Sequence, residues 1–330
     1  EERKMPYKIL IPQPVAPEGV EFLEDQGYEV LMGTGVSEEA LLREVADCDA
    51  VLLRTAPFDG KILEAGKRLQ VVARHGAGYN NVDLETAARL GIWVTNTPDA
   101  TTSSVAEFTL GALICCARNM AACGRRMKEG EFSYKNTHKG MDLRGKTLAV
   151  IGFGRIGREV AKKAHLALGM RILAYSPSLT PEKAPEYAEA AEWEKCFREA
   201  DFVSLHMPLK ESTRGIVGEK EFSMMKPTAR LINCARGEVV KEAELICALE
   251  TGEIGGAFLD VFEKEPPQPD NPLFSMENVT VTPHMASNTE ECMALMARQA
   301  AEQIHQVLSG NRPSWAVNRP EHPRNILKNH

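Results

Sequence analysis

The sequence lacks the long hydrophobic run that a membrane-spanning helix needs. Its longest uncharged apolar stretch, Phe108 to Ala117, is far shorter than the roughly 20 residues that cross a bilayer, and Glu107 and Arg118 bound it. The first residues, Glu1 to Lys4, lack the apolar core of a signal peptide. We therefore expect a cytoplasmic protein without a membrane partner.

The sequence also lacks cysteine motifs that bind metal. The eight cysteines include no C-x-x-C pair, and none stands at a spacing from histidine that suits zinc. We expect reduced, mostly buried thiols and no metal site. The cysteines are Cys48, Cys115, Cys116, Cys123, Cys196, Cys234, Cys247 and Cys292.

Basic runs are also missing. The formal net charge is -7 and the pI is near 5.7, which argues against a nucleic-acid partner. The 330 residues exceed the usual size of one domain, so we expect two domains.

Short apolar runs alternate with helical patterns over the first hundred residues. The expected strands are Tyr7–Ile11, Glu29–Met32, Ala50–Leu53, Leu69–Ala73 and Ile92–Thr95. The expected helices are Glu18–Gln26, Ser37–Ala46, Gly60–Lys67 and Leu84–Leu90, with Ser37 and Asp83 as N-caps. This alternation predicts a parallel sheet that is covered by helices on both faces.

A long helical stretch, Thr101 to Glu129, separates this unit from a second alternation. We expect two helices there, and they are apolar enough to pack against something, such as another subunit. The later strands are expected at Thr147–Ile151, Met170–Tyr175, Phe202–Leu205, Arg230–Ile232, Gly256–Leu259 and Val279–Thr282. A final helix is expected at Glu290–Leu308. The chain is thus predicted to form two α/β units.

A glycine-rich motif, G-F-G-R-I-G, follows the strand at Thr147–Ile151 and opens an amphipathic helix. In this context Gly152 permits a tight turn, Gly154 lets a pyrophosphate approach the backbone, and Gly157 lets helix and strand pack closely. The phosphates would meet the free N–H groups at the helix start, around Arg155 and Ile156. The alternative is a purely structural turn.

The acidic residue that usually follows such a motif by about 20 positions is missing. The next strand ends in A-Y-S-P-S-L-T, so Ser176 stands where Asp or Glu would hold the adenosine ribose. Without that carboxylate a 2′-phosphate is not repelled, and Ser176, Ser178 and Thr180 could donate hydrogen bonds to it. No arginine in this turn can clamp a dianion, and Lys183 is only a loose candidate. NAD and NADP both remain open.

Three polar residues lie at the ends of expected strands of the second unit: Arg236, Glu265 and His284. Ligands of open parallel sheets bind beyond the carboxyl ends of the strands, so these side chains can converge. Arginine can grip a carboxylate through two hydrogen bonds, and an imidazolium can protonate a carbonyl oxygen as hydride arrives. A carboxylate bonded to the far nitrogen would orient the ring and favour its charged form. The alternative for each residue alone is a surface or capping side chain.

From about Ile9 to Asn318 the chain resembles the D-isomer-specific 2-hydroxyacid dehydrogenases. The segments that carry the resemblance are G-F-G-R-I-G, I-N-C-A-R-G-E-V-V, G-A-F-L-D-V-F-E-K-E-P and V-T-P-H-M-A-S. The resemblance implies a Rossmann cofactor domain plus a flavodoxin-like substrate domain, both doubly wound parallel sheets. It places the substrate-binding domain at residues 1–99 and 288–330 and the dinucleotide-binding domain at residues 100–287. It also implies a homodimer formed through the apolar helices.

The resemblance assigns roles as well. Arg236, Glu265 and His284 match the family's catalytic set, which exchanges a hydride between NAD or NADP and a small 2-keto or 2-hydroxy acid. It implies that Asp260 contacts the nicotinamide carboxamide and that Cys234 lies in the cofactor wall.

The substrate side of the site is expected in V-V-A-R-H-G-A-G-Y-N-N. Gly76, Ala77 and Gly78 can expose successive N–H groups, a nest suited to the substrate carboxylate. Arg54 and Arg74 resemble residues that phosphoglycerate dehydrogenases place near substrate, and two arginines could recognise a phosphate. The alternative is that they form salt bridges or bind only a carboxylate. Hydroxypyruvate, glyoxylate and a 3-phosphoglycerate-like compound are all candidate substrates.

Two rival functions are compatible with the sequence. Transcriptional corepressors that share this fold bind nucleotide, act through partners and retain the same three catalytic residues. A nucleotide-binding module without activity is the second rival. Because the sequence ends soon after Asn318, we also expect no regulatory domain and no feedback control by serine.

Overall fold

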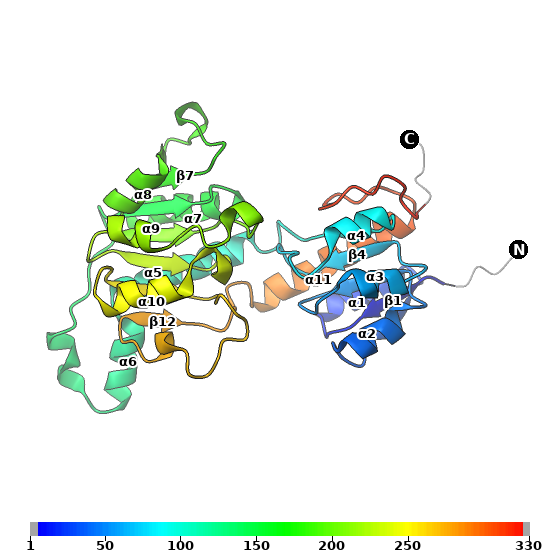
Figure 1. Cartoon of the computed structure of the whole chain (residues 1–330), viewed down its shortest axis with the longest axis horizontal. Helices are drawn as coiled ribbons and strands as arrows, with labels where there is room; N and C mark the ends of the chain where they lie inside the picture. The colour runs from blue at the N-terminus through cyan, green and yellow to red at the C-terminus, as the bar shows by residue number, and fades with distance from the viewer. Residues whose placement is uncertain (1–5, 326–330) are drawn as a thin grey trace, which may run out of the picture. The chain divides into compact units, whose positions relative to one another are not determined.

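A computed structural model of the chain describes residues 6–325. The chain divides into two compact units. Unit 1 contains the chain up to Thr101 and from Asn288 onward, and unit 2 contains Thr102–Ser287. The domain boundaries expected from the resemblance, at 99/100 and 287/288, lie within two residues of these. Each unit is described by itself (Figure 1).

Unit 1 is built on a five-stranded parallel sheet in the order β2-β1-β3-β4-β5. This order is the one found in flavodoxin-like folds. The strands are β1 (Lys8–Ile11), β2 (Glu29–Met32), β3 (Ala50–Leu53), β4 (Val71–Arg74) and β5 (Trp93–Thr95). The helices are α1 (Pro17–Asp25), α2 (Glu38–Val45), α3 (Gly60–Ala65), α4 (Leu84–Arg89) and α11 (Glu290–Leu308).

Unit 2 is built on a seven-stranded parallel sheet in the order β12-β11-β10-β9-β6-β7-β8. Counted from β6, its first six strands have the Rossmann order, and the order reverses between β6 and β9. The strands are β6 (Thr147–Ile151), β7 (Arg171–Tyr175), β8 (Glu189–Ala190), β9 (Phe202–Leu205), β10 (Arg230–Asn233), β11 (Gly256–Leu259) and β12 (Val279–Val281). The helices are α5 (Thr102–Ala117), α6 (Met120–Lys128), α7 (Arg155–Leu168), α8 (Trp193–Glu199), α9 (Glu219–Met224) and α10 (Glu242–Glu250).

Each sheet is covered on both faces, and its strands show why. Along β6, Leu148 and Val150 enter the core beneath α5 and α7, whereas Ala149 and Ile151 enter the core beneath α8 to α10. In unit 1, Val51 and Leu53 face one core and Ala50 and Leu52 face the other. A parallel strand buried on both sides needs such a continuous apolar run. The predicted fold class, two doubly wound parallel sheets, is therefore confirmed.

The helical stretch at 101–129 forms two helices, as predicted, but they differ in burial. Helix α5 packs against α7 and the sheet and buries Val105, Ala106 and Leu113, among others. Helix α6 has no buried residue, and together with the 3-10 helix η1 (Phe132–Asn136) it projects from unit 2 (Figure 1).

No single helix among residues 6–325 is both long and apolar enough to span a bilayer. Helices α5 and α6 together are long and apolar enough for a membrane span, but the chain bends by 63° at the break between them.

Candidate active site

The turn between β6 and α7 is shaped by its glycines. Gly152 has a φ of 100°, and a Cβ there would lie 2.6 Å from the backbone carbon of His206. A Cβ on Gly157 would lie 2.1 Å from the Gly152 carbonyl oxygen. Around Gly154, by contrast, a Cβ would meet no atom within 4 Å. Two glycines thus allow close packing, and the third leaves open space over the backbone, which is the space that a pyrophosphate needs.

The start of α7 lies next to this open space. Gly154 is the N-cap, the helix begins at Arg155, and Gly154 offers no side-chain oxygen to the first-turn amides. The first N–H groups of a helix lack intrahelical partners and favour an anion. The loop therefore fits a dinucleotide, with the backbone from Gly152 to Gly157 as its phosphate cradle.

Ser176 directly follows β7 and is half-buried, and its carbonyl accepts a hydrogen bond from Leu179 N at 2.9 Å. The turn from Ser176 to Thr180 contains no acidic residue.

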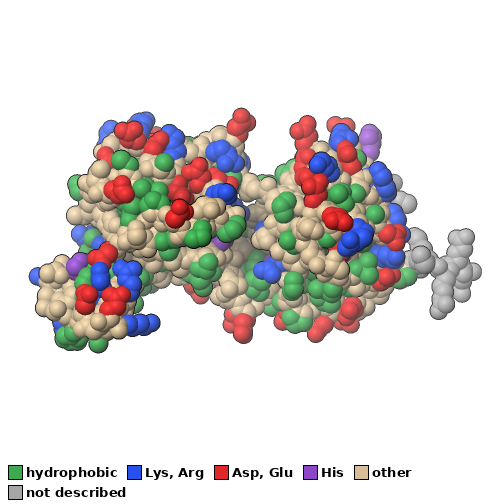
Figure 2. Space-filling view, turned by 60° about the horizontal axis from the view of Figure 1, so that its bottom comes forward, with side chains coloured by type: hydrophobic (Ala, Val, Ile, Leu, Met, Phe, Trp, Pro, Cys, Tyr) green, Lys and Arg blue, Asp and Glu red, His purple; other side chains and the backbone are tan. Residues whose placement is uncertain are grey.

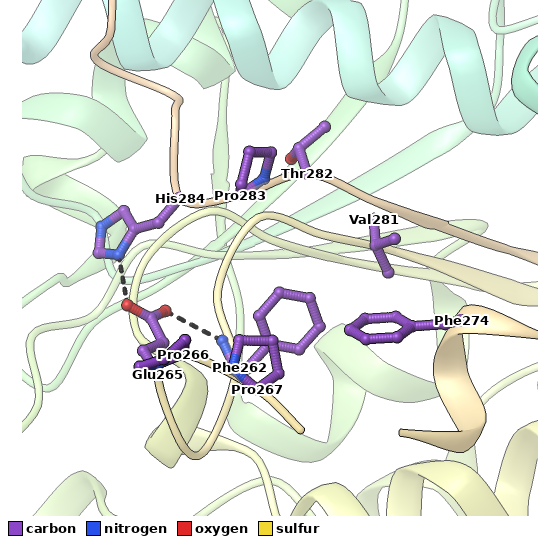
Figure 3. Close-up of a pocket in the computed structure, with 9 residues that line it drawn as sticks. All are labelled: Phe262, Glu265, Pro266, Pro267, Phe274, Val281, Thr282, Pro283 and His284. Atoms are coloured by element: carbon purple, nitrogen blue, oxygen red, sulfur yellow. Dashed lines mark hydrogen bonds and ion pairs between the residues drawn. The ribbon is translucent and has the colours of Figure 1, made fainter. Parts of the chain in front are cut away.

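A histidine and a glutamate form a hydrogen-bonded pair beyond the ends of β11 and β12. His284 Nδ1 lies 2.7 Å from Glu265 Oε2, and the Phe262 N–H donates to Glu265 Oε1 at 3.1 Å (Figure 3). The side chains are 49% and 36% exposed, respectively. Because Nδ1 is bonded to Glu265, Nε2 is the ring nitrogen that can face a ligand.

The environment of Glu265 favours its charged form. Burial opposes ionisation, but the hydrogen bond and charge of His284, the Phe262 N–H and the charge of Arg236 outweigh it and lower the pKa of Glu265. The carboxylate is therefore negative throughout the neutral range.

Arg236 lies in the turn after β10 and is half-buried. Its guanidinium donates to the Ala235 carbonyl at 2.6 Å, and Asn233 Nδ2 donates to the Arg236 carbonyl at 2.9 Å. Burial lowers the pKa of Arg236, whereas the charges of Glu265 and Glu238 raise it. An arginine partly removed from water close to a carboxylate is suited to gripping an anionic substrate.

Close backbone packing joins the Arg236 turn to the loop that carries Glu265. A Cβ on Gly237 would lie 1.9 Å from the backbone carbon of Phe262 and 2.5 Å from Glu263 N. Only glycine fits there. The structure thus brings Arg236, Glu265 and His284 into one region of unit 2, as the sequence predicts.

The two residues that the resemblance placed beside the nicotinamide are both buried. Burial raises the pKa of the Cys234 thiol. The Asp260 carboxylate accepts hydrogen bonds from Thr282 Oγ1, Met285 N and Ala286 N. Their contacts with the cofactor stay predictions.

A cavity of 330 Å³ lies beside the His284–Glu265 pair, on the Glu265 side of the ring (Figure 3). Its walls are mainly apolar. The lining residues are Phe262, Glu265, Pro266, Pro267, Phe274, Val281, Thr282, Pro283 and His284.

In unit 1 the proposed substrate loop follows β4. Arg74 Nε donates to Asn81 Oδ1 at 3.0 Å, and its guanidinium also donates to the His75 carbonyl. Asn81 Nδ2 donates to the carbonyls of Arg54 and Ala56. Arg54 itself donates to the Pro14 carbonyl at 2.9 Å. Asn81, for which the sequence predicts no role, thus connects the two arginine segments.

One expectation for this loop needs correction. The Gly76 N–H donates to Thr97 Oγ1 at 2.9 Å, so it is not available to a ligand. The nest therefore reduces to the amides of Ala77 and Gly78. Thr97 lies 21 residues further along the chain, beyond the reach of a local pattern.

Among residues 6–325, no three histidine, cysteine or acidic side chains are grouped so that they could hold a metal ion.

Comparison with known proteins places these residues in context. Residues 110–286 match the family model for the D-isomer specific 2-hydroxyacid dehydrogenase, NAD binding domain. The chain is 40% identical to D-3-phosphoglycerate dehydrogenase of Methanocaldococcus jannaschii over 323 residues, which is 97% of this chain and 61% of the relative. It therefore spans about three fifths of that relative. It is also 40% identical to glyoxylate reductase of Korarchaeum cryptofilum over 287 residues, 86% of each chain.

A solved structure supports the same comparison. The NADPH-dependent glyoxylate/hydroxypyruvate reductase of Sinorhizobium meliloti, in complex with NADP and malonate, matches with a TM-score of 0.85 at 29% identity. The match covers 97% of this chain and 98% of that one.

Proposed function

The chain belongs to the D-isomer specific 2-hydroxyacid dehydrogenase family, and we propose that it interconverts a small 2-keto acid and its D-2-hydroxy acid with NAD or NADP. The observation that carries the proposal is the 2.7 Å bond between His284 Nδ1 and Glu265 Oε2, in the unit that also holds Arg236 and the glycine loop. The relatives described above are dehydrogenases and reductases, so they lend no support to the corepressor alternative.

Each side chain has a step in this reaction. A nicotinamide bound in unit 2 would supply or accept the hydride. His284 donates a proton from Nε2 to the carbonyl oxygen during reduction and takes it back from the hydroxyl during oxidation. Glu265 holds the ring by Nδ1 and offsets the imidazolium charge. Arg236 binds the substrate carboxylate through paired N–H groups.

The cofactor contacts are assigned to unit 2. The backbone of Gly152, Gly154, Arg155, Ile156 and Gly157 would hold the pyrophosphate, and Ser176 would hold the adenosine ribose. Cys234 and Asp260 would hold the nicotinamide. The missing acidic residue at Ser176, together with an NADPH-dependent structural neighbour, supports use of NADP as well as NAD.

Unit 1 supplies the substrate side, with Ala77 and Gly78 toward the carboxylate. Hydroxypyruvate and glyoxylate are the first candidates, because Arg54 and Arg74 already donate to oxygen atoms of the chain itself. A phosphorylated substrate is the second candidate, supported by the 40% identity to a phosphoglycerate dehydrogenase. Rates with hydroxypyruvate, glyoxylate and phosphohydroxypyruvate test this choice. If Arg54 binds a phosphate, R54M will raise the KM for phosphohydroxypyruvate and leave the KM values for hydroxypyruvate and glyoxylate unchanged.

We also propose a cytoplasmic homodimer that associates through the projecting α6–η1 segment. Met120, Met127 and Phe132 are 56%, 56% and 65% exposed there, which is unusual for large apolar side chains. All eight cysteines are free, as expected in a reducing compartment. On the face in Figure 2, acidic and basic side chains of the described residues are interspersed, which does not favour a nucleic-acid partner. Light scattering tests the dimer, and M127E with F132E should give a monomer.

A further inference from the structure

His284 has an unusual backbone conformation. Its φ is 49°, in the left-handed region that only a few per cent of residues other than glycine adopt. Strained residues of this kind persist only where the surrounding structure holds them, and they are common in functional sites. The question is therefore which contacts impose this conformation on His284.

Four hydrogen bonds from the segment around His284 end on one residue, Asp260. The His284 N–H donates to the Asp260 carbonyl at 2.8 Å. Thr282 Oγ1 and Met285 N donate to Asp260 Oδ1 at 2.6 and 2.9 Å, and Ala286 N donates to Oδ2 at 2.9 Å. Asp260 itself is fully buried directly after β11.

Asp260 is also linked by hydrogen bonds to the segment that carries Arg236. Asp260 N donates to the Asn233 carbonyl at 2.9 Å. The Asn233 side chain in turn accepts from Ala235 N at 3.1 Å and donates to the Arg236 carbonyl at 2.9 Å. Asp260 and Asn233 thus connect the backbone of Arg236 to that of His284 through hydrogen bonds inside unit 2.

We propose that Asp260 is a positioning residue for the acid–base catalyst. It holds the Thr282–Ala286 segment so that His284 Nδ1 meets Glu265 and Nε2 is left for the substrate. This inference rests on the proposed dehydrogenase function and goes beyond the nicotinamide contact that the resemblance assigned to Asp260.

The chemistry of the contacts makes the carboxylate specific. Both oxygens face donors, so an asparagine would turn its NH₂ group against an N–H from Met285 or Ala286. D260N should therefore release the segment although its volume is nearly unchanged. Because Asp260 is buried, D260N alone could also impair folding, so a second variant is needed.

Thr282 provides that variant. T282V removes only the hydroxyl that donates to Asp260, and T282S restores it. T280V makes the same change two residues earlier on β12, where the hydroxyl has no hydrogen bond to any residue between 6 and 325. We expect T282V to lower kcat for keto-acid reduction about tenfold, the usual effect of losing one hydrogen bond to a charged group. T282S and T280V should keep most of the parent kcat. The dissociation constant for NADH or NADPH, from fluorescence titration, should stay within about twofold in all three.

A second readout does not depend on turnover. The ring proton resonances of His284, assigned by their absence in His284→Gln, report the bond to Glu265. In T282V they should shift in the direction seen in E265Q, and in T282S and T280V they should not. Unchanged kcat and unchanged His284 resonances in T282V would overturn the proposal. So would a tenfold loss of cofactor affinity with an unchanged kcat, which would mean that the network acts on the cofactor. If the parent shows no turnover but the resonances shift, the dehydrogenase proposal fails and the positioning role stands.

Discussion

His284 Nδ1 lies 2.7 Å from Glu265 Oε2, and this bond decides which nitrogen of the imidazole is left for chemistry. Glu265 is fixed by the Phe262 N–H at 3.1 Å, and its pKa is lowered by His284 against the effect of burial. A ring held in this way has one orientation and one reactive nitrogen. The pair can therefore act as a directed proton donor.

The charge of Glu265 should support proton donation by His284. E265Q removes the negative charge that offsets the imidazolium, so kcat for keto-acid reduction should fall at least about tenfold. The kcat with hydroxypyruvate, measured at one fixed pH, tests this prediction. D270N, a change of an exposed carboxylate on the same loop, is the control. An E265Q rate that equals that of D270N would remove Glu265 from its role.

Ser176 should govern cofactor choice. S176D introduces a carboxylate where the 2′-phosphate of NADP is expected, and charge repulsion should raise the KM for NADPH at least about tenfold. The KM for NADH should stay equal or fall, because the carboxylate can accept hydrogen bonds from the ribose hydroxyls. Measuring both cofactors with one preparation provides the internal control. Unchanged NADPH kinetics would show that Ser176 does not face the ribose.

His75 should make unit 1 sensitive to acid. It is 4% exposed, and burial, followed by the charges of Arg54 and Arg74, lowers its pKa to about 4. Between its ordinary value near 6.5 and about 4, the unfolded chain binds this proton and the folded chain does not. The free energy of unfolding should therefore fall with pH in this window by up to about 1.4 kcal/mol per unit.

Urea unfolding of the parent and of H75Q at pH 7 and pH 5 tests this prediction. The parent should lose more stability between the two pH values than H75Q does. The same loss in both would mean that His75 is not buried in its neutral form.

Much of the fold follows from local pattern. The strands were found because parallel strands buried on both faces are continuous apolar runs. Helix starts were found from caps that the structure confirms: Ser37 Oγ accepts from Ala40 N, and Asp83 Oδ1 accepts from Thr86 N. The break between α5 and α6 was expected, but not its cause at Asn119, where φ is 50°. Strand β8, two residues long, left no pattern to detect.

The sequence predicted which residues form the candidate site, but not the hydrogen bonds that link them. Arg236, Glu265 and His284 were identified from their places after strands, and Gly152 and Gly157 from their spacing. The role of Asp260 depends on Thr282, Met285 and Ala286, which follow it by more than twenty residues. Likewise, the Gly76 N–H donates to Thr97 Oγ1, which lies far along the chain. Such bonds depend on which strands become neighbours, so they appear only once the sheets are assembled.

The most direct test is the rate at which the purified protein consumes NADH and NADPH with hydroxypyruvate, compared with that of His284→Gln. We expect turnover with at least one cofactor, and a loss of about two to four orders of magnitude in the variant, as is typical when a general acid is removed. A variant that reduces hydroxypyruvate at nearly the parent rate would contradict the assignment of His284 as the proton donor.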